Sequence, residues 1–196
     1  MAKGSGGTRG VNTSLKMANI LHKYVKPSSD DYAFRNAYLN HKNDTESYEN
    51  ASLEYYTNYG YDEINKKLRN GTSLSDKEKA IIYFLDKKLK AVPKYDGLVY
   101  RGVALNNEQL KSYTVGNEVK FNSYSSASKK LSVAKNSTTN GGGDNEVIFR
   151  IHSNRGRDIS SSAVHSEEQE VLFGRNQKFK VQKISNRKGY TYIDLV

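Results

Sequence analysis

Two glutamates near the C-terminal end are the residues whose type and spacing most clearly suggest chemistry. Glu168 and Glu170 occur in the segment SEEQEVLF. Residues two apart on a strand project from the same face, roughly 6.5 Å apart. Paired carboxylates can stabilise a positive charge that develops on a sugar, as in glycoside cleavage. Solvated acids at an exposed strand start and a metal site are the alternatives, and because no familiar ligand spacing surrounds the pair, we expect no metal.

An arginine and a group of serines are the second and third candidate groups. Arg101 lies within the apolar segment LVYRGV. Because a guanidinium cannot lose its charge, Arg101 serves either as an anion ligand, as half of a structural salt bridge, or at a strand edge that reaches water. Serines crowd the segment FNSYSSAS, at Ser123, Ser125, Ser126 and Ser128. Their hydroxyls either orient a ligand or bond to the backbone of a turn.

The composition excludes several other chemistries. The 196 residues contain no cysteine, so a disulfide framework, a zinc–thiolate site and a cysteine nucleophile are impossible. No G-x-S-x-G elbow surrounds a serine, and the four histidines show no triad context, which argues against a serine hydrolase. A net charge of +10 would suit a polyanionic partner. The basic residues are scattered, however, and no nucleic-acid-binding signature accompanies them.

The elements that must position these residues follow from hydrophobic periodicity, which changes near Pro93 from helical to strand-like. Residues 73–90 form the clearest helix, with Ser75 and Glu78 at capping-box spacing, and an earlier helix ends near Asn70 with Gly71 as its cap. Short strands are expected at residues 98–103, 118–125, 146–152, 169–173, 178–184 and 190–196. Short helices are expected at residues 106–113 and 129–137.

The length of the chain suits one compact domain. Four of the first ten residues are glycines, so we expect residues 1–10 to form a flexible leader and residues 11–196 a single domain. Within that domain, residues 11–93 form the helical part and residues 94–196 the β core. No segment has the apolar length of a signal peptide or a membrane span, so we expect a soluble monomer without membrane contact.

In chain order, the three candidate groups closely resemble the arginine–serine–glutamate class of mono-ADP-ribosyltransferases, found among bacterial toxins, phage enzymes and vertebrate ecto-enzymes. LVYRGV resembles that family's early arginine strand, FNSYSSAS its aromatic-led strand with a Ser-Thr-Ser motif, and EQEVLF its Glu-x-Glu strand. Ala127 departs from the threonine usual at the centre of the serine motif. We prefer the frame with Ser126 in first position, while a register shifted by one would place Ser125 there.

The resemblance implies an α+β fold, with a helical N-terminal half packed on a two-sheet, mainly antiparallel β core that binds NAD. It also implies the role of each residue. Glu170 would stabilise an oxocarbenium-like ribose, Ser126 would orient Glu170 and the ribose, and Arg101 would clamp the NAD phosphates. Gly102 and Ser128 are the other residues expected at the cofactor.

The first glutamate indicates the acceptor. Arginine-modifying members of the family keep a glutamate at the position of Glu168, whereas asparagine-modifying members usually carry glutamine. A carboxylate there can bind a guanidinium and accept its proton. Arg155 and Arg157, in the preceding segment, either assist the NAD diphosphate or are surface charge.

The implied activity is transfer of ADP-ribose from NAD to an arginine on a target protein, with release of nicotinamide. The resemblance to toxins and phage enzymes further implies an effector that acts in the cytoplasm or is delivered to the cytosol of a target cell. Two alternatives stay open. One is ADP-ribosylation of nucleic acid, suggested by the basic charge alone, and the other is a catalytically silent basic module with the same fold.

Overall fold

The computed structural model describes residues 6–139, 143–161 and 166–196. The chain divides into two compact units, Met1–Ala91 and Val92–Val196. The division falls two residues before the change at residues 93 and 94 that the sequence predicts. The N-terminal unit is helical and the C-terminal unit contains every described strand.

The N-terminal unit contains five α-helices and one π-helical segment among its described residues. They are α1 (Gly6–His22), α2 (Tyr32–His41), α3 (Ser47–Tyr55), η1 (Tyr56–Gly60), α4 (Tyr61–Asn70) and α5 (Asp76–Ala91). We expected a flexible leader over residues 1–10, whereas α1 already begins at Gly6. Once later residues have formed a helix, adding one more residue at its end avoids the cost of nucleation. Residues 1–5 lie outside the described residues.

The helix ends in this unit follow local chemistry that the sequence shows. The backbone N–H of Glu78 donates to Ser75 Oγ over 3.2 Å, and the Ser75 N–H donates to the Glu78 carboxylate over 2.7 Å, which confirms the capping box. Gly71 ends α4 with a φ of 65°, as its predicted role as a helix cap requires. Aromatic rings then fill the space between helices, as in the stack of Tyr48 on Phe84.

The C-terminal unit contains eight strands and three short helices among its described residues. Its strands are β1 (Gly97–Leu105), β2 (Glu118–Phe121), β3 (Ser125–Ser128), β4 (Asn145–Ser153), β5 (Arg157–Asp158), β6 (Glu170–Phe173), β7 (Gln177–Arg187) and β8 (Tyr190–Leu195). Its helices are α6 (Asn107–Lys111), α7 (Leu131–Thr138) and the 3-10 helix η2 (Ser166–Glu168). The two helices expected near residues 106 and 129 are confirmed.

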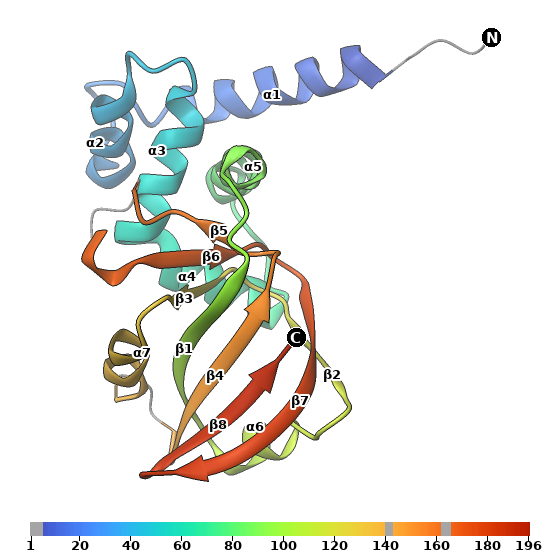
Figure 1. Cartoon of the computed structure of the whole chain (residues 1–196). Helices are drawn as coiled ribbons and strands as arrows, with labels where there is room; N and C mark the ends of the chain where they lie inside the picture. Colours follow the sequence, from blue (N-terminus) through green and yellow to red (C-terminus); the bar gives the residue numbers. More distant parts are fainter. Residues whose placement is uncertain (1–5, 140–142, 162–165) are drawn as a thin grey trace, which may run out of the picture. The chain divides into compact units, whose positions relative to one another are not determined.

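The strands pair in the order β2-β7-β8-β4-β1-β3-β6-β5, and Figure 1 shows β1, β4 and β8 side by side. Every pair is antiparallel except β4 with β8, so the α+β, mainly antiparallel fold is confirmed. We expected two sheets, whereas the strands form one continuous hydrogen-bonded series. The reason is the long β7, which pairs with β2 through residues 177–180 and with β8 from Val181 onward, where a bulge interrupts the register.

One predicted strand is divided in the structure. Residues 118–125 were expected to form a single strand, but β2 pairs with β7 and β3 pairs with β6. The chain must therefore change partners between Phe121 and Ser125. The two-residue β5, which pairs with β6, was not expected, because so short a strand has no sequence periodicity of its own.

Alternation along the strands places apolar side chains in a single core of this unit. The core residues are Val99, Ala127, Val147, Phe149, Ile151, Val171, Phe173, Phe179, Val181, Ile193 and Leu195. Arg101 is two residues from Val99 and lies opposite the core residue Phe149, so it starts from the core side of β1.

Gly102 belongs to the other side of β1, against which α7 packs. A Cβ at Gly102 would lie 1.7 Å from the carbonyl oxygen of Ala134 in α7, so only glycine permits this approach. We expected Gly102 to contact the cofactor. That role stays a prediction, and the structure adds that the missing side chain of Gly102 admits the close approach of α7.

We expect Gly102→Ala to lower the free energy of unfolding by about 1–3 kcal/mol, the usual cost of overpacking a well-filled site. Urea denaturation followed by circular dichroism measures this difference. Gly10→Ala is the control, because a Cβ at Gly10 meets no atom within 4 Å. Equal stability of Gly102→Ala and the unchanged protein would contradict the close packing of α7 on β1.

Candidate active site

The register of β3 against β6 brings a serine and a glutamate together. Ser128 lies opposite Glu170, and Ser126 is two residues along β3, so these three side chains share one face of the sheet. Ser125 lies opposite Phe173, a core residue, and is itself buried. The geometry therefore favours the frame in which Ser126, and not Ser125, accompanies Glu170.

Arg101 reaches the same place from β1. Its Nη1 donates a hydrogen bond to the backbone carbonyl of Ser126 over 2.7 Å. Its charge also acts on Glu170, whose pKa it lowers. We expected Arg101 to lie in an otherwise buried strand, but only Val99 among the nine residues of β1 is buried. Arg101 itself is partly exposed, and its guanidinium approaches both the backbone of Ser126 and the carboxylate of Glu170.

Glu170 has an unusual electrostatic environment. Burial raises the pKa of its carboxyl above the ordinary value, and the neighbouring charge of Glu168 raises that pKa further. The hydroxyl of Ser126, which donates to the carboxylate, and the charge of Arg101 act in the opposite direction. A carboxylate withdrawn from water in this way interacts strongly with any cation placed beside it, because solvent screens the interaction less.

Glu168 lies near Glu170, but not for the reason that the sequence suggested. The premise that Glu168 and Glu170 share one strand is wrong, because β6 begins at Glu170 and Glu168 ends the 3-10 helix η2. Between them Gln169 has a φ of 48°, a left-handed backbone that breaks the extended path. Glu168 is exposed, and its charge is still felt by Glu170.

The hydroxyls of two serines of the cluster form hydrogen bonds with backbone groups. The only hydroxyl hydrogen of Ser128 is donated to the carbonyl of Glu168 over 2.5 Å, and the same oxygen accepts from the N–H of Lys130 over 2.9 Å. Ser128 was expected at the cofactor, but its hydroxyl is buried and cannot donate to NAD while it holds Glu168. Ser123 is also buried and donates to the carbonyl of Tyr124.

The two arginines of the preceding segment differ in their surroundings. Arg157 is on β5, and its Nη1 donates to the carbonyl of Val92 over 3.0 Å. Arg155 lies with its guanidinium 4.7 Å from the centre of the Phe179 ring. Both positions have local partners. Residues 162–165 of the same segment lie outside the described residues.

Tyr113 is a neighbour of Arg101 that the sequence did not single out. Burial raises the pKa of its phenol, and the charge of Arg101 lowers that pKa. Its ring packs on Phe149 with centroids 5.1 Å apart. No sequence signal marks it, because Tyr113 follows a short surface helix and reaches Arg101 only through the fold.

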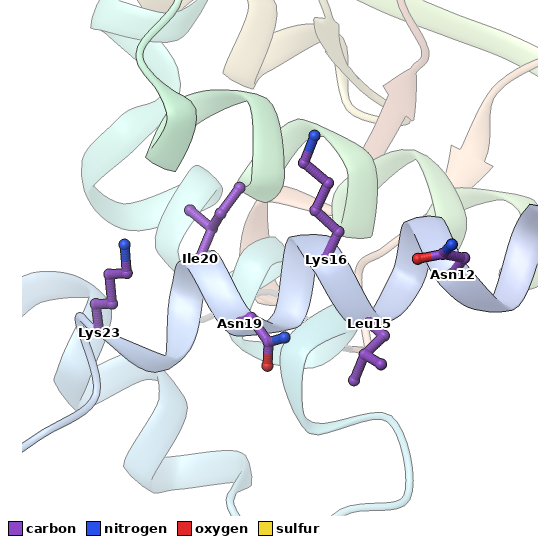
Figure 2. Close-up of a pocket in the computed structure, with 6 residues that line it drawn as sticks. All are labelled: Asn12, Leu15, Lys16, Asn19, Ile20 and Lys23. Atoms are coloured by element: carbon purple, nitrogen blue, oxygen red, sulfur yellow. The ribbon is translucent and has the colours of Figure 1, made fainter.

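Among residues 6–139, 143–161 and 166–196, no group of three or more histidines, aspartates and glutamates could hold a metal ion. Within that part of the chain, no helix is long and apolar enough to cross a bilayer. One pocket of about 350 Å³ follows α1 and is lined by Asn12, Leu15, Lys16, Asn19, Ile20 and Lys23 (Figure 2). It includes none of the candidate site residues.

The fold is that of the ADP-ribosyltransferases. The structure of the ADP-ribosyltransferase Vis of Vibrio splendidus in complex with agmatine aligns with 100% of this chain and 86% of the Vis chain, at 23% identity and a TM-score of 0.65. The family model for NAD:arginine ADP-ribosyltransferase matches residues 10–196. The chain therefore belongs to the NAD:arginine ADP-ribosyltransferase family, which confirms the resemblance seen in its motifs.

Curated relatives carry the same family name. The chain is 34% identical over 148 residues to Mav of Mycobacterium avium, whose name describes an NAD–arginine ADP-ribosyltransferase. It is 28% identical over 143 residues to the NAD–protein-arginine ADP-ribosyltransferase Tre1 of Serratia proteamaculans. The aligned parts are 74% and 73% of this chain, but only 17% of Mav and 30% of Tre1. The chain thus spans less than a third of either relative.

The electrostatics of the site predict opposite effects of two substitutions on the Glu170 carboxyl. Ser126→Ala removes a hydrogen bond to the charged form and is expected to raise the pKa of Glu170, whereas Glu168→Gln removes a like charge and is expected to lower it. Carbon-13 NMR titration of the carboxyl measures both shifts. Ser137→Ala, at an exposed serine of α7, is the control and should leave the titration unchanged. Shifts in the same direction for both variants would contradict this arrangement.

Proposed function

We propose that the chain transfers ADP-ribose from NAD to arginine side chains of target proteins and releases nicotinamide. The observation that carries the proposal is the convergence of Arg101, Ser126 and Glu170 at one point of the β core, in a member of this family. NAD is consumed in this reaction, so it is a co-substrate, and the reaction requires no metal.

The first step is loss of nicotinamide from the ribose. The bond between ribose C1' and the nicotinamide nitrogen breaks, and the electron pair leaves with nicotinamide, which becomes neutral. The ribose left behind is an oxocarbenium-like cation. We assign its stabilisation to the partly buried carboxylate of Glu170, which would also accept a hydrogen bond from the ribose 2'-hydroxyl. Ser126 orients that carboxylate through its hydroxyl.

Binding of NAD is assigned to Arg101. A guanidinium keeps its charge at any working pH and presents forked N–H donors that suit phosphate oxygens. The hydrogen bond from Nη1 to the Ser126 carbonyl fixes the guanidinium beside the serine and the glutamate. A diphosphate bound there would place the attached ribose close to Glu170.

The second step is attack of the acceptor on the ribose. We assign the binding and deprotonation of the acceptor to Glu168. An acceptor nitrogen forms a bond to ribose C1' and must lose a proton, and an arginine does so reluctantly because its guanidinium is charged. An exposed carboxylate at Glu168 can bind the guanidinium and take that proton. The agmatine in the Vis structure supports a guanidinium ligand in this fold, since agmatine carries the same group as arginine.

The proposed partner is a target protein that presents an arginine. All four site residues come from one chain, so a monomer suffices for the reaction. In keeping with the toxins of the family, we further propose that the enzyme is an effector that acts in the cytosol of a target cell. Incubation of a cell lysate with labelled NAD, followed by mass spectrometry of modified residues, identifies the acceptor. Labelling of RNA without labelling of protein would contradict the proposal of a protein target.

Substitutions of the two glutamates are expected to affect transfer and NAD hydrolysis differently. Glu170→Gln removes the charge that stabilises the ribose cation and should lower both transfer to agmatine and NAD hydrolysis by at least about a hundredfold. Glu168→Gln removes only the acceptor's base, so transfer should fall by a similar factor while some hydrolysis remains. Nicotinamide release and ADP-ribosyl-agmatine formation, measured in parallel, separate the two activities.

Glu118→Gln is the matched control, because Glu118 is an exposed glutamate of β2 that pairs with Lys178. It should leave both activities unchanged. Equal loss of hydrolysis in Glu168→Gln and Glu170→Gln would contradict the division of roles between the glutamates.

A further inference from the structure

Three consecutive carbonyls before β6 all accept hydrogen bonds from three consecutive residues at the end of β3, the first of which is the last residue of that strand. The bonds run from Ser128 Oγ to Glu168 O at 2.5 Å, from Lys129 N to Gln169 O at 3.2 Å, and from Lys130 Nζ to Glu167 O at 2.8 Å. We refer to these three bonds as the carbonyl clamp. Two of them depend on side chains, those of Ser128 and Lys130, and can be removed by substitution.

The segment that the carbonyl clamp holds has little stability of its own. The 3-10 helix η2 contains only three residues, and such short helices have poor hydrogen-bond geometry. Gln169 then adopts a left-handed backbone with a φ of 48°, which a residue with a side chain adopts at a cost. Such a conformation persists only where its surroundings impose it. The carbonyl clamp supplies that constraint at the residues on either side of the Glu168 side chain.

The donor side of the carbonyl clamp is itself anchored. Lys129 Nζ lies 2.5 Å from the carboxylate of Asp158 in β5 and 5.0 Å from the centre of the Tyr95 ring. Although burial would raise the pKa of Asp158, its hydrogen bonds with Lys129 and Ser160 lower that pKa, which favours the charged carboxylate that Lys129 contacts. Because residue 129 is fixed in this way, the donors on both sides of it are fixed as well.

Glu170 does not depend on the carbonyl clamp to the same degree. It lies within β6, which pairs with β3 on one side and β5 on the other, and Ser126 holds its carboxylate. Glu168, by contrast, precedes the strand, and its backbone carbonyl is held by Ser128. Loss of the clamp should therefore displace Glu168 more than Glu170.

We propose that Ser128 and Lys130 are positioning residues that fix Glu168, and that through it they determine whether ADP-ribose passes to a guanidinium or to water. This inference rests on the proposed function of the site. Neither residue needs to touch NAD or the acceptor. Their effect is on the geometry of the carboxylate that receives the acceptor's proton.

The test compares two activities in two variants of the full chain. Ser128→Ala and Lys130→Met are each expected to lower transfer to agmatine about tenfold, because a misplaced catalytic group loses rate steeply with distance. Nicotinamide release without acceptor should stay within about twofold of the unchanged protein, since Glu170 is held by other contacts. Ser128→Thr and Lys130→Arg keep a hydroxyl and a cationic donor, and should restore most of the transfer.

Lys178→Met is the matched control. It removes the same charge from an exposed lysine that pairs with Glu118, and it should leave the ratio of transfer to hydrolysis unchanged. Lys130 is exposed, so Lys130→Met folds even if Ser128→Ala does not. An unchanged ratio in Lys130→Met, or an equal fall of transfer and hydrolysis, would overturn the inference. Absence of NAD turnover in the unchanged protein would instead overturn the proposed function.

Discussion

The antiparallel register of β3 with β6 is the constraint on which the rest of the site depends. It sets Ser128 opposite Glu170 and brings Ser126 to the same face, so the serine hydroxyl meets the carboxylate. Arg101 reaches this point only because β1 pairs with β3. A slip of one residue between β3 and β6 would turn Ser126 and Glu170 to opposite faces and separate the hydroxyl from the carboxylate.

The site keeps a carboxylate where the protein gains nothing in stability from it. Burial raises the pKa of Glu170, so its charged form costs free energy at neutral pH, and the hydrogen bond from Ser126 and the charge of Arg101 offset only part of that cost. The left-handed Gln169 is a second unfavourable feature next to the first. The Glu170 carboxylate becomes useful if a cation forms nearby, because a poorly solvated carboxylate stabilises a cation more than a solvated one does.

The helix caps and one strand of the site could be predicted from local sequence. The capping box of Ser75 and Glu78 and the Gly71 cap depend on neighbours in sequence, and β6 was expected nearly in place. The sequence could not show that Gly102 admits α7, that Ser128 binds the Glu168 carbonyl, or that Gln169 interrupts the strand, because each depends on a tertiary contact. The resemblance selected three segments that the fold brings together, and the strand register shows which of their side chains share a face.

The most direct measurement is a crystal structure of the chain with a non-hydrolysable NAD analogue. We expect the diphosphate to contact Arg101 and the ribose next to nicotinamide to lie within hydrogen-bonding distance of the Glu170 carboxylate. An analogue bound away from these residues, for example along the α1 pocket of Figure 2, would contradict this expectation.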